Sequence, residues 1–240
     1  MDINDLHNDH ISQQFNVELD TVKSHMLEMG GMVEKQVSDA INAILNTDSG
    51  VAEHVKEHDK VINQMEVNID EECTRILARR QPAASDLRLV IAISKAISDL
   101  ERIGDEAGKI ATQALNLSEN GEASKGYVEI RMIGDHVSRM LSDALDSFAR
   151  LDVDKALAVA QEDKFVDAEY GTATRSVMTY MMEDPRSITS MLNVLWSLRS
   201  LERIGDHARN ISEHVIYLVK GKDVRHVGLK QMAAEVKGTN

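Results

Sequence analysis

Two identical six-residue strings place paired carboxylates at helical spacing in this chain. Leu100-Glu101-Arg102-Ile103-Gly104-Asp105 recurs 101 positions later as Leu201-Glu202-Arg203-Ile204-Gly205-Asp206. In each string the Glu and the Asp stand four residues apart, so on a helix they are neighbours, and like charges there cost about 0.2–0.5 kcal/mol unless something compensates them. Because the chain keeps this unfavourable arrangement twice, the pattern predicts a bound cation or a basic partner.

The helices that carry these strings must hold the carboxylates beside a buried face. When the residues are projected at about 100° each, Glu101 and Asp105 fall on one flank of the apolar stripe. Glu202 and Asp206 repeat that placement. A glycine inside a helix costs about 1 kcal/mol relative to alanine, so the glycine of each string is predicted to permit close approach of a neighbouring helix.

The preceding helix of each copy offers further oxygen ligands. With its apolar residues buried, one flank carries Asp59 in the first copy and both Asp163 and Asp167 in the second. Each copy is therefore predicted to contain an oxygen-rich groove between its second and third helices. The candidate metal ligands are Glu101, Asp105, Glu202, Asp206, Asp59, Asp163 and Asp167.

Gathered carboxylate oxygens are hard ligands that suit magnesium, manganese, calcium or iron, and without a cation their mutual repulsion raises their pKa values. An alternative is that the same side chains are boundary residues, either paired with arginines of an adjacent helix or simply solvated. The sequence leaves both interpretations open.

Enzyme motifs are missing from the sequence. No Glu precedes a His by three residues and no His-Glu-x-x-His string occurs, so neither a di-iron carboxylate enzyme nor a zinc protease is supported. His54 and His58 are four residues apart, but their counterparts in the second copy are Ala158 and Glu162, which favours surface or interface histidines. A redox or hydrolytic metalloenzyme is therefore disfavoured.

Composition predicts an all-helical protein. The 240 residues include two prolines and 3% aromatics, with 42% hydrophobic residues, and the most frequent types suit helices better than sheets. A formal net charge of −13 argues against nucleic-acid binding, which requires dense Lys and Arg. Cations and basic protein surfaces are the better partners.

The compartment expected from the sequence is the cytoplasm. The single cysteine, Cys73, has no intramolecular disulfide partner, and the N-terminus lacks the apolar stretch of a signal peptide. No run of 18 apolar residues is present to span a bilayer. We expect no direct membrane insertion, so any association with the inner membrane would be peripheral and through partners.

The duplication covers nearly the whole chain. Ser38-Asp39-Ala40-Ile41 aligns with Ser142-Asp143-Ala144-Leu145 at an offset of 104, and Pro82 pairs with Pro185 at 103. Each copy is predicted to form three helices, at 14–46, 50–80 and 86–118, then 127–151, 154–183 and 187–220. The predicted domains are 1–120 and 121–222, each a three-helix repeat, followed by a polar C-terminal tail over 223–240.

Several strings besides the duplicated one resemble the PhoU family, bacterial accessory proteins of phosphate transport and phosphate signalling. They are Gln14-Phe15, Gly30-Gly31-Met32-Val33-Glu34, Ser85-Asp86-Leu87-Arg88 and Val219-Lys220-Gly221. The resemblance implies a tandem pair of three-helix bundles with pseudo-twofold symmetry and no catalytic activity. It also implies that the Glu-x-x-x-Asp motifs hold metal, with iron, zinc, manganese and magnesium as the candidate ions.

The resemblance further implies a function and partners. Members of this family act as negative regulators of the phosphate regulon and of high-affinity phosphate uptake. They link the ATPase subunit of the phosphate ABC transporter to the sensor histidine kinase PhoR, and a homodimer is the expected assembly. The alternative function is a helical adaptor whose acidic grooves bind basic partner surfaces directly, with metal incidental. The sequence singles out no residue as partner-binding.

Overall fold

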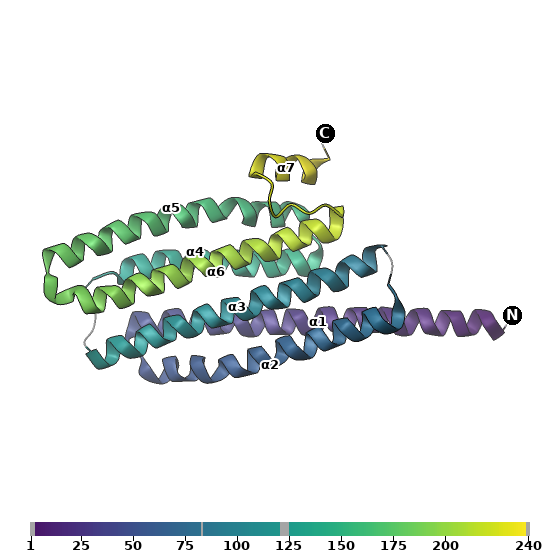
Figure 1. Ribbon diagram of the computed structural model, residues 1–240, viewed down its shortest axis with the longest axis horizontal. Helices are drawn as coiled ribbons and strands as arrows, with labels where there is room; N and C mark the ends of the chain where they lie inside the picture. The colour runs from purple at the N-terminus through teal and green to yellow at the C-terminus, as the bar shows by residue number, and fades with distance from the viewer. Residues whose placement is uncertain (1–2, 83, 121–124, 239–240) are drawn as a thin grey trace.

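The computed structural model describes residues 3–82, 84–120 and 125–238, and in these ranges the chain is helical without strands, as predicted. Six long helices form the body of the molecule within these ranges (Figure 1). Their bounds are α1 Ile3–Asn46, α2 Ser49–Arg80, α3 Ala84–Asn120, α4 Tyr127–Arg150, α5 Val153–Glu183 and α6 Ile188–Lys220. A short 3₁₀ helix, η1 (Pro185–Ser187), precedes α6, and α7 (Leu229–Lys237) follows it.

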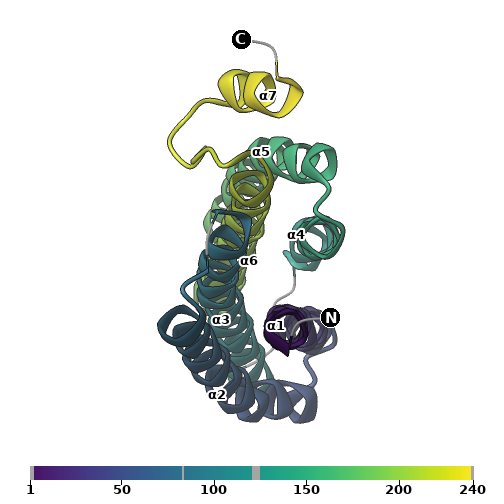
Figure 2. The same ribbon diagram turned by 90° about the vertical axis from the view of Figure 1, so that its right-hand side faces the viewer.

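The helices form two three-helix bundles that lie side by side. Helices α1, α2 and α3 pack on one another, and α4, α5 and α6 do the same. Seen end-on, α2, α3, α6 and α5 form a curved row, with α1 and α4 lying along one side of it (Figure 2). The bundles join where α3 packs on α6 and α1 packs on α4, so the contact pairs equivalent helices of the two copies. This arrangement agrees with the predicted pseudo-twofold symmetry.

Aspartates at the turns decide where helices begin. Asp48 and Asp152 stand directly before α2 and α5, and their side chains accept hydrogen bonds from backbone N–H groups of the first turn. Asp184 accepts from the N–H of Arg186 and is followed by Pro185, a combination of N-cap residue and first-turn proline that favours a helix start. Gly221, with φ of 70°, ends α6.

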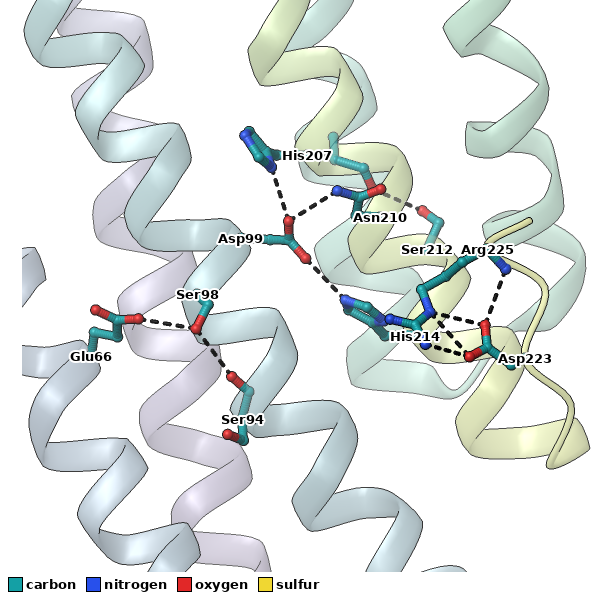
Figure 3. Close-up of polar contacts among 11 residues, drawn as sticks. Glu66, Ser94, Ser98, Asp99, His207, Asn210, Ser212, His214, Asp223 and Arg225 are labelled. Carbon is teal, nitrogen blue, oxygen red and sulfur yellow. Dashed lines mark hydrogen bonds and ion pairs between the residues drawn. The ribbon is translucent and has the colours of Figure 1, made fainter.

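The bundle interface contains a buried polar network (Figure 3). Asp99 of α3 accepts hydrogen bonds from His207 Nδ1 at 2.9 Å and from Asn210 Nδ2 at 3.0 Å through Oδ1, and from His214 Nε2 at 2.9 Å through Oδ2. Asp99 and both histidines are buried. Three side chains of the second bundle therefore converge on one carboxylate of the first.

An arginine of the second repeated string also crosses this interface. Arg203 Nη1 lies 3.0 Å from Oε1 of Glu106, a buried residue of α3 that Lys109 Nζ also contacts, at 2.9 Å. At one end of the interface, Arg88 Nε donates to the backbone oxygen of Leu218 at 3.1 Å, near the C-terminus of α6. A cation there is favoured by the helix dipole. These contacts fix how the two grooves are placed relative to each other.

The C-terminal segment contains a helix that the sequence analysis did not predict. Instead of a purely polar tail over 223–240, the described part of this segment returns to the body of the molecule, and α7 packs on α5. Val224, Met232 and Val236 are buried there. The nine-residue helix is too short to give a clear periodic pattern, so packing on α5 determines its structure.

Candidate metal centre

Three of the predicted ligands meet in the second bundle. Asp167 of α5 and the pair Glu202 and Asp206 of α6 each offer one carboxylate oxygen, and these three oxygens lie within 4.8 Å of one another. We call this group the acidic triad. Glu202 is buried with 9% of its surface exposed, whereas Asp167 and Asp206 are exposed. The triad is the one group of this kind within residues 3–82, 84–120 and 125–238.

The helical spacing explains this geometry. Glu202 and Asp206 are one turn apart on α6, so their side chains point to the same side. The intervening Gly205 has no side chain, and a Cβ there would lie 3.5 Å from both Val137 and Val166. That distance is ordinary van der Waals contact, so the packing of α4 and α5 on α6 at this level does not require the glycine, contrary to the expectation from the sequence. Asp167 follows Val166 directly and is thereby brought to the groove.

The electrostatics of the triad favour an added positive charge. Partial desolvation raises the pKa of Glu202, and the neighbouring Asp206 raises it further. Desolvation together with Asp163 and Asp167 raises the pKa of Asp206, and desolvation together with Asp163 raises that of Asp167. Oε1 of Glu202 accepts from Arg199 Nη1 at 2.7 Å, but its buried Oε2 has no hydrogen-bond partner. A metal ion bound here would meet that unsatisfied oxygen, so the residues fit the predicted cation.

Asp163, also predicted as a ligand, makes a different contact. Its Oδ2 lies 2.8 Å from Nη1 of Arg209, whose Nε also lies 3.0 Å from Oε1 of Glu213. Asp163 and Glu213 are both buried. Asp163 therefore sits near the triad as half of a buried ion pair, which is the arrangement that the alternative interpretation of the sequence describes.

The predicted ligands of the first bundle are close together but less tightly grouped. The pKa of Glu101 is raised by burial and by the negative charges of Asp105, Glu66 and Asp59. Burial and Asp105 also raise the pKa of Asp59, and Oδ1 of Asp59 is buried without a hydrogen-bond partner. Among the residues that the structure describes, no three carboxylates here meet the spacing found in the second bundle.

The other candidate residues lie outside these grooves. The rings of His54 and His58 have centroids 5.8 Å apart, and neither belongs to a three-ligand group within the described ranges. Cys73 is buried, and burial raises the pKa of its thiol to about 12. That thiol stays protonated at neutral pH and is poorly reactive.

Sequence reasoning missed the interface network around Asp99, although a signal was present. Asp99 and Glu106 are seven residues apart on α3, and His207 and His214 are seven apart on α6. Seven residues are about two helical turns, so the two acidic residues lie on one face of α3 and the two histidines lie on one face of α6. This pattern could have indicated that the two helices pack along those faces. The sequence also gave no means to name Arg209 as the partner of Asp163 or Arg199 as that of Glu202.

No helix in the part of the chain that the structure describes is long and apolar enough to cross a membrane.

Comparison with known proteins gives the family. The family model described as "PhoU domain" matches the chain twice, over residues 26–114 and 130–215. The "Phosphate-specific transport system accessory protein PhoU homolog" of Pseudomonas putida is 69% identical over 230 residues, covering 96% of this chain and 90% of that relative. The protein of Escherichia coli K12 named "Phosphate-specific transport system accessory protein PhoU" is 53% identical over 221 residues, covering 92% and 91%.

A solved structure is similar over most of this chain. The crystal structure of PhoU from Pseudomonas aeruginosa superposes with a TM-score of 0.85 at 66% identity, covering 87% of this chain and all of that one. The family consists of accessory and regulatory proteins rather than enzymes. The duplicated helical unit, the Glu-x-x-x-Asp strings and these matches lead to one conclusion: the chain belongs to the PhoU family.

Proposed function

We propose that this protein is a negative regulator of the phosphate regulon and of high-affinity phosphate uptake, acting as a metal-binding helical scaffold. Its partners are the ATPase subunit of the phosphate ABC transporter and the sensor histidine kinase PhoR, and it works in the cytoplasm as a homodimer. The names of the relatives, which refer to the phosphate-specific transport system, support the link to the transporter.

The observation that carries the metal-binding part is the acidic triad. Three carboxylate oxygens from Asp167, Glu202 and Asp206 lie within 4.8 Å of one another, and one oxygen of Glu202 is buried without a partner. A cation would offset both the repulsion and the missing hydrogen bond. All-oxygen ligands favour manganese, magnesium or iron over zinc, which prefers nitrogen and sulfur.

Elemental analysis tests this proposal directly. The protein is purified without chelator, beside a triad variant that carries Asp167→Asn, Glu202→Gln and Asp206→Asn. We expect bound metal in the wild-type protein and less in the triad variant. A wild-type protein that holds no metal and gains none on titration with Mn²⁺ would contradict metal binding.

Regulation is tested in cells. In a bacterial strain lacking its own PhoU, a phosphate-regulon reporter is measured at high phosphate after complementation with this chain. We expect the wild-type chain to restore low expression and the triad variant to leave expression high. High expression with the wild-type chain would count against the regulatory function.

A matched control tests whether the effect of the triad variant comes from the positions of its three carboxylates or only from the loss of negative charge. The surface control carries Asp20→Asn, Glu57→Gln and Asp135→Asn, which are exposed carboxylates on other helices. Like the triad variant, it removes three negative charges, but it leaves the triad residues unchanged. We expect it to bind metal and restore low expression like the wild-type chain.

The second candidate function is an adaptor whose acidic grooves bind basic partner surfaces without metal. The pairing of Arg199 with Glu202 and of Arg209 with Asp163 favours it, because a guanidinium already fits against these carboxylates. Capture of the two named partners distinguishes the functions. If chelator-treated, metal-free protein captures them as well as the untreated protein and the triad variant does not, the adaptor function holds.

A further inference from the structure

Helices α4 and α5 leave a groove between them on the second bundle, which we call the α4–α5 groove. Its cavity measures about 380 Å³. The lining is mostly apolar and includes Val128, Met132 and Ile133 of α4 with Ala168 and Ala173 of α5. The two charged residues that line it, Glu129 and Glu169, are both acidic. The groove therefore combines apolar surface with negative charge.

Apolar side chains are exposed along this groove. Val128 and Met132 are four residues apart on α4, so they lie on one side of that helix, and they are 70% and 55% exposed. A single exposed apolar side chain is ordinary on a protein surface. Neighbouring ones that line the same cavity, next to charged residues, are typical of an interaction site.

The first bundle carries polar residues at the same positions. An offset of 104 residues pairs the two copies in this region. At this offset the counterparts of Val128, Met132, Ala168 and Thr172 are Ser24, Glu28, Gln64 and Asn68, which are all exposed. Polar residues are expected where a helix faces only water, so the apolar surface is particular to the second copy.

A side-chain bridge also distinguishes the two copies. In the first bundle, His25 Nδ1 of α1 lies 2.9 Å from Oε2 of Glu72 of α2 and joins the two helices. The counterparts of these residues are Glu129 and Ser176. Glu129 instead accepts a hydrogen bond from the hydroxyl of Tyr180 at 3.0 Å, about one turn further along α5. The groove is thus left open at Ser176.

Both carboxylates of the groove can accept a further donor. Glu129 uses Oε1 for Tyr180, and Glu169 uses Oε2 for His136 Nδ1 at 3.0 Å. Within the described ranges, the second oxygen of each carboxylate has no hydrogen-bond partner. Lysine or arginine side chains of a bound partner would find an acceptor on either helix.

We propose that the α4–α5 groove binds a basic amphipathic helix of another protein. Such a helix carries apolar residues at positions i, i+3, i+4 and i+7, and these pack against Val128 and Met132 while its lysines or arginines pair with Glu129 and Glu169. A second copy of this chain is the poorer occupant, because its net charge of −13 opposes the two carboxylates. This inference does not depend on metal binding.

The test measures the binding of two synthetic peptides to the full chain by fluorescence anisotropy. The lysine peptide has leucines at positions i, i+3, i+4 and i+7 and lysines elsewhere, with a fluorescent label. The glutamate peptide has glutamates in place of the lysines. We expect the wild-type protein to bind the lysine peptide and not the glutamate peptide, and added salt to weaken the binding.

The groove variant gives the second copy two residues of the first. It carries Val128→Ser and Met132→Glu, at exposed positions where the first copy has these residues, so the bundle is expected to fold. We expect it to bind the lysine peptide about tenfold or more weakly, because apolar contacts are lost. The added glutamate would strengthen an association that was only electrostatic, so the direction of the change separates the two causes.

Two further variants serve as control and as test of charge. The apolar control carries Val67→Ser and Met178→Glu, which are 49% and 50% exposed and lie outside the groove lining, and it is expected to keep the binding. The charge variant carries Glu129→Gln and Glu169→Gln. Glutamine keeps an acceptor for Tyr180 and His136, and the lost charges are expected to weaken the binding of the lysine peptide.

Four results would overturn the inference. They are a wild-type protein that does not bind the lysine peptide, a groove variant that binds it no more weakly, equal binding of both peptides, and conversion of a dimer to a monomer by the groove variant in sedimentation equilibrium. The last result would show that a second copy occupies the groove. The proposed function stands in each case, because its metal and reporter tests do not involve this groove.

Discussion

Asp99 of α3 and His214 of α6 join the two bundles through a buried hydrogen bond of 2.9 Å between Oδ2 and Nε2. The same carboxylate also accepts from His207 and Asn210. These donors outweigh the desolvation of Asp99 and lower its pKa to about 2. One side chain of the first repeat is therefore held ionised by three of the second.

We expect Asp99→Asn to lower the free energy of unfolding by about 3 kcal/mol, because the substitution leaves buried donors without an acceptor charge. Urea denaturation at pH 7 measures the change. The matched control is Asp135→Asn, at an exposed position of α4, which is expected to change stability by less than about 0.5 kcal/mol. Equal losses from the two variants would show that the network is not stabilising.

The pH dependence of Asp99 has a defined sign. Its pKa in the folded protein is lowered from 3.8 to about 2, so its contribution to stability is complete above 3.8 and is lost as the pH falls through 2. We expect the stability difference between wild type and Asp99→Asn to stay constant from pH 7 to about pH 5 and to shrink below that. A difference that already collapses near neutral pH would contradict this.

The acidic triad is expected to give stability the opposite pH dependence. The pKa values of Glu202, Asp206 and Asp167 are higher in the folded protein than in the unfolded chain, where they are about 4. Without metal, the stability that these groups contribute is therefore complete below about pH 4 and is lost as the pH rises through their pKa values in the folded protein. We expect the triad variant to be more stable than the wild type at pH 7.5 without metal. That advantage is expected to disappear toward pH 4 in thermal melts.

Added Mn²⁺ provides the check on the triad. The ion is expected to raise the melting temperature of the wild-type protein at pH 7.5 more than that of the triad variant, since a ligand stabilises the state it binds. The effect is expected to weaken as the pH falls, because protons compete for the same oxygens. If the rise in melting temperature caused by Mn²⁺ did not depend on pH, the ion would have to bind at a site other than the triad.

The two glycines of the repeated strings are expected to respond differently to alanine. A Cβ on Gly205 meets Val137 and Val166 at 3.5 Å, an ordinary contact, so Gly205→Ala is expected to stabilise the protein by about 1 kcal/mol through helix propensity. Gly104→Ala brings Cβ to 3.1 Å from Gln36 Oε1 and is expected to give no such gain. Chemical denaturation of both variants measures the contrast, and equal gains would contradict it.

Arg209 is expected to be needed for stability because it lies between two buried carboxylates. Arg209→Ala leaves Asp163 and Glu213 without their cation, at a cost of about 3–5 kcal/mol. The control Arg131→Ala, at an exposed position of α4, is expected to be nearly neutral. If both variants unfold at the same urea concentration, the Arg209 pairs contribute nothing.

Most of the fold could be predicted from local signals. Asp48, Asp152 and the pair Asp184 and Pro185 mark helix starts, and the predicted boundaries of the six long helices agree with the structure to within a few residues except at the start of α1. The duplication supplied the two-bundle arrangement, because two copies of one unit are expected to form the same substructure. Helix α7 was not predicted, because its structure depends on contact with α5.

The site was only partly predictable. The spacing of Glu202 and Asp206 places them together on α6, and the apolar stripe of α5 adds Asp167. The pairing of Asp163 with Arg209, 46 residues away, depends on which rotamers two packed helices allow, and periodicity carries no such information.

The contact of α3 with α6 has a consequence for the gene duplication behind it. At the offset of the repeated string, the counterpart of Asp99 is Ser200 and that of His207 is Glu106. Two first halves placed in the same arrangement would therefore set Asp99 of one against Glu106 of the other, which is a buried clash of like charges. In this respect the two halves are complementary and not interchangeable, because the second supplies the histidines that the Asp99 carboxylate of the first contacts.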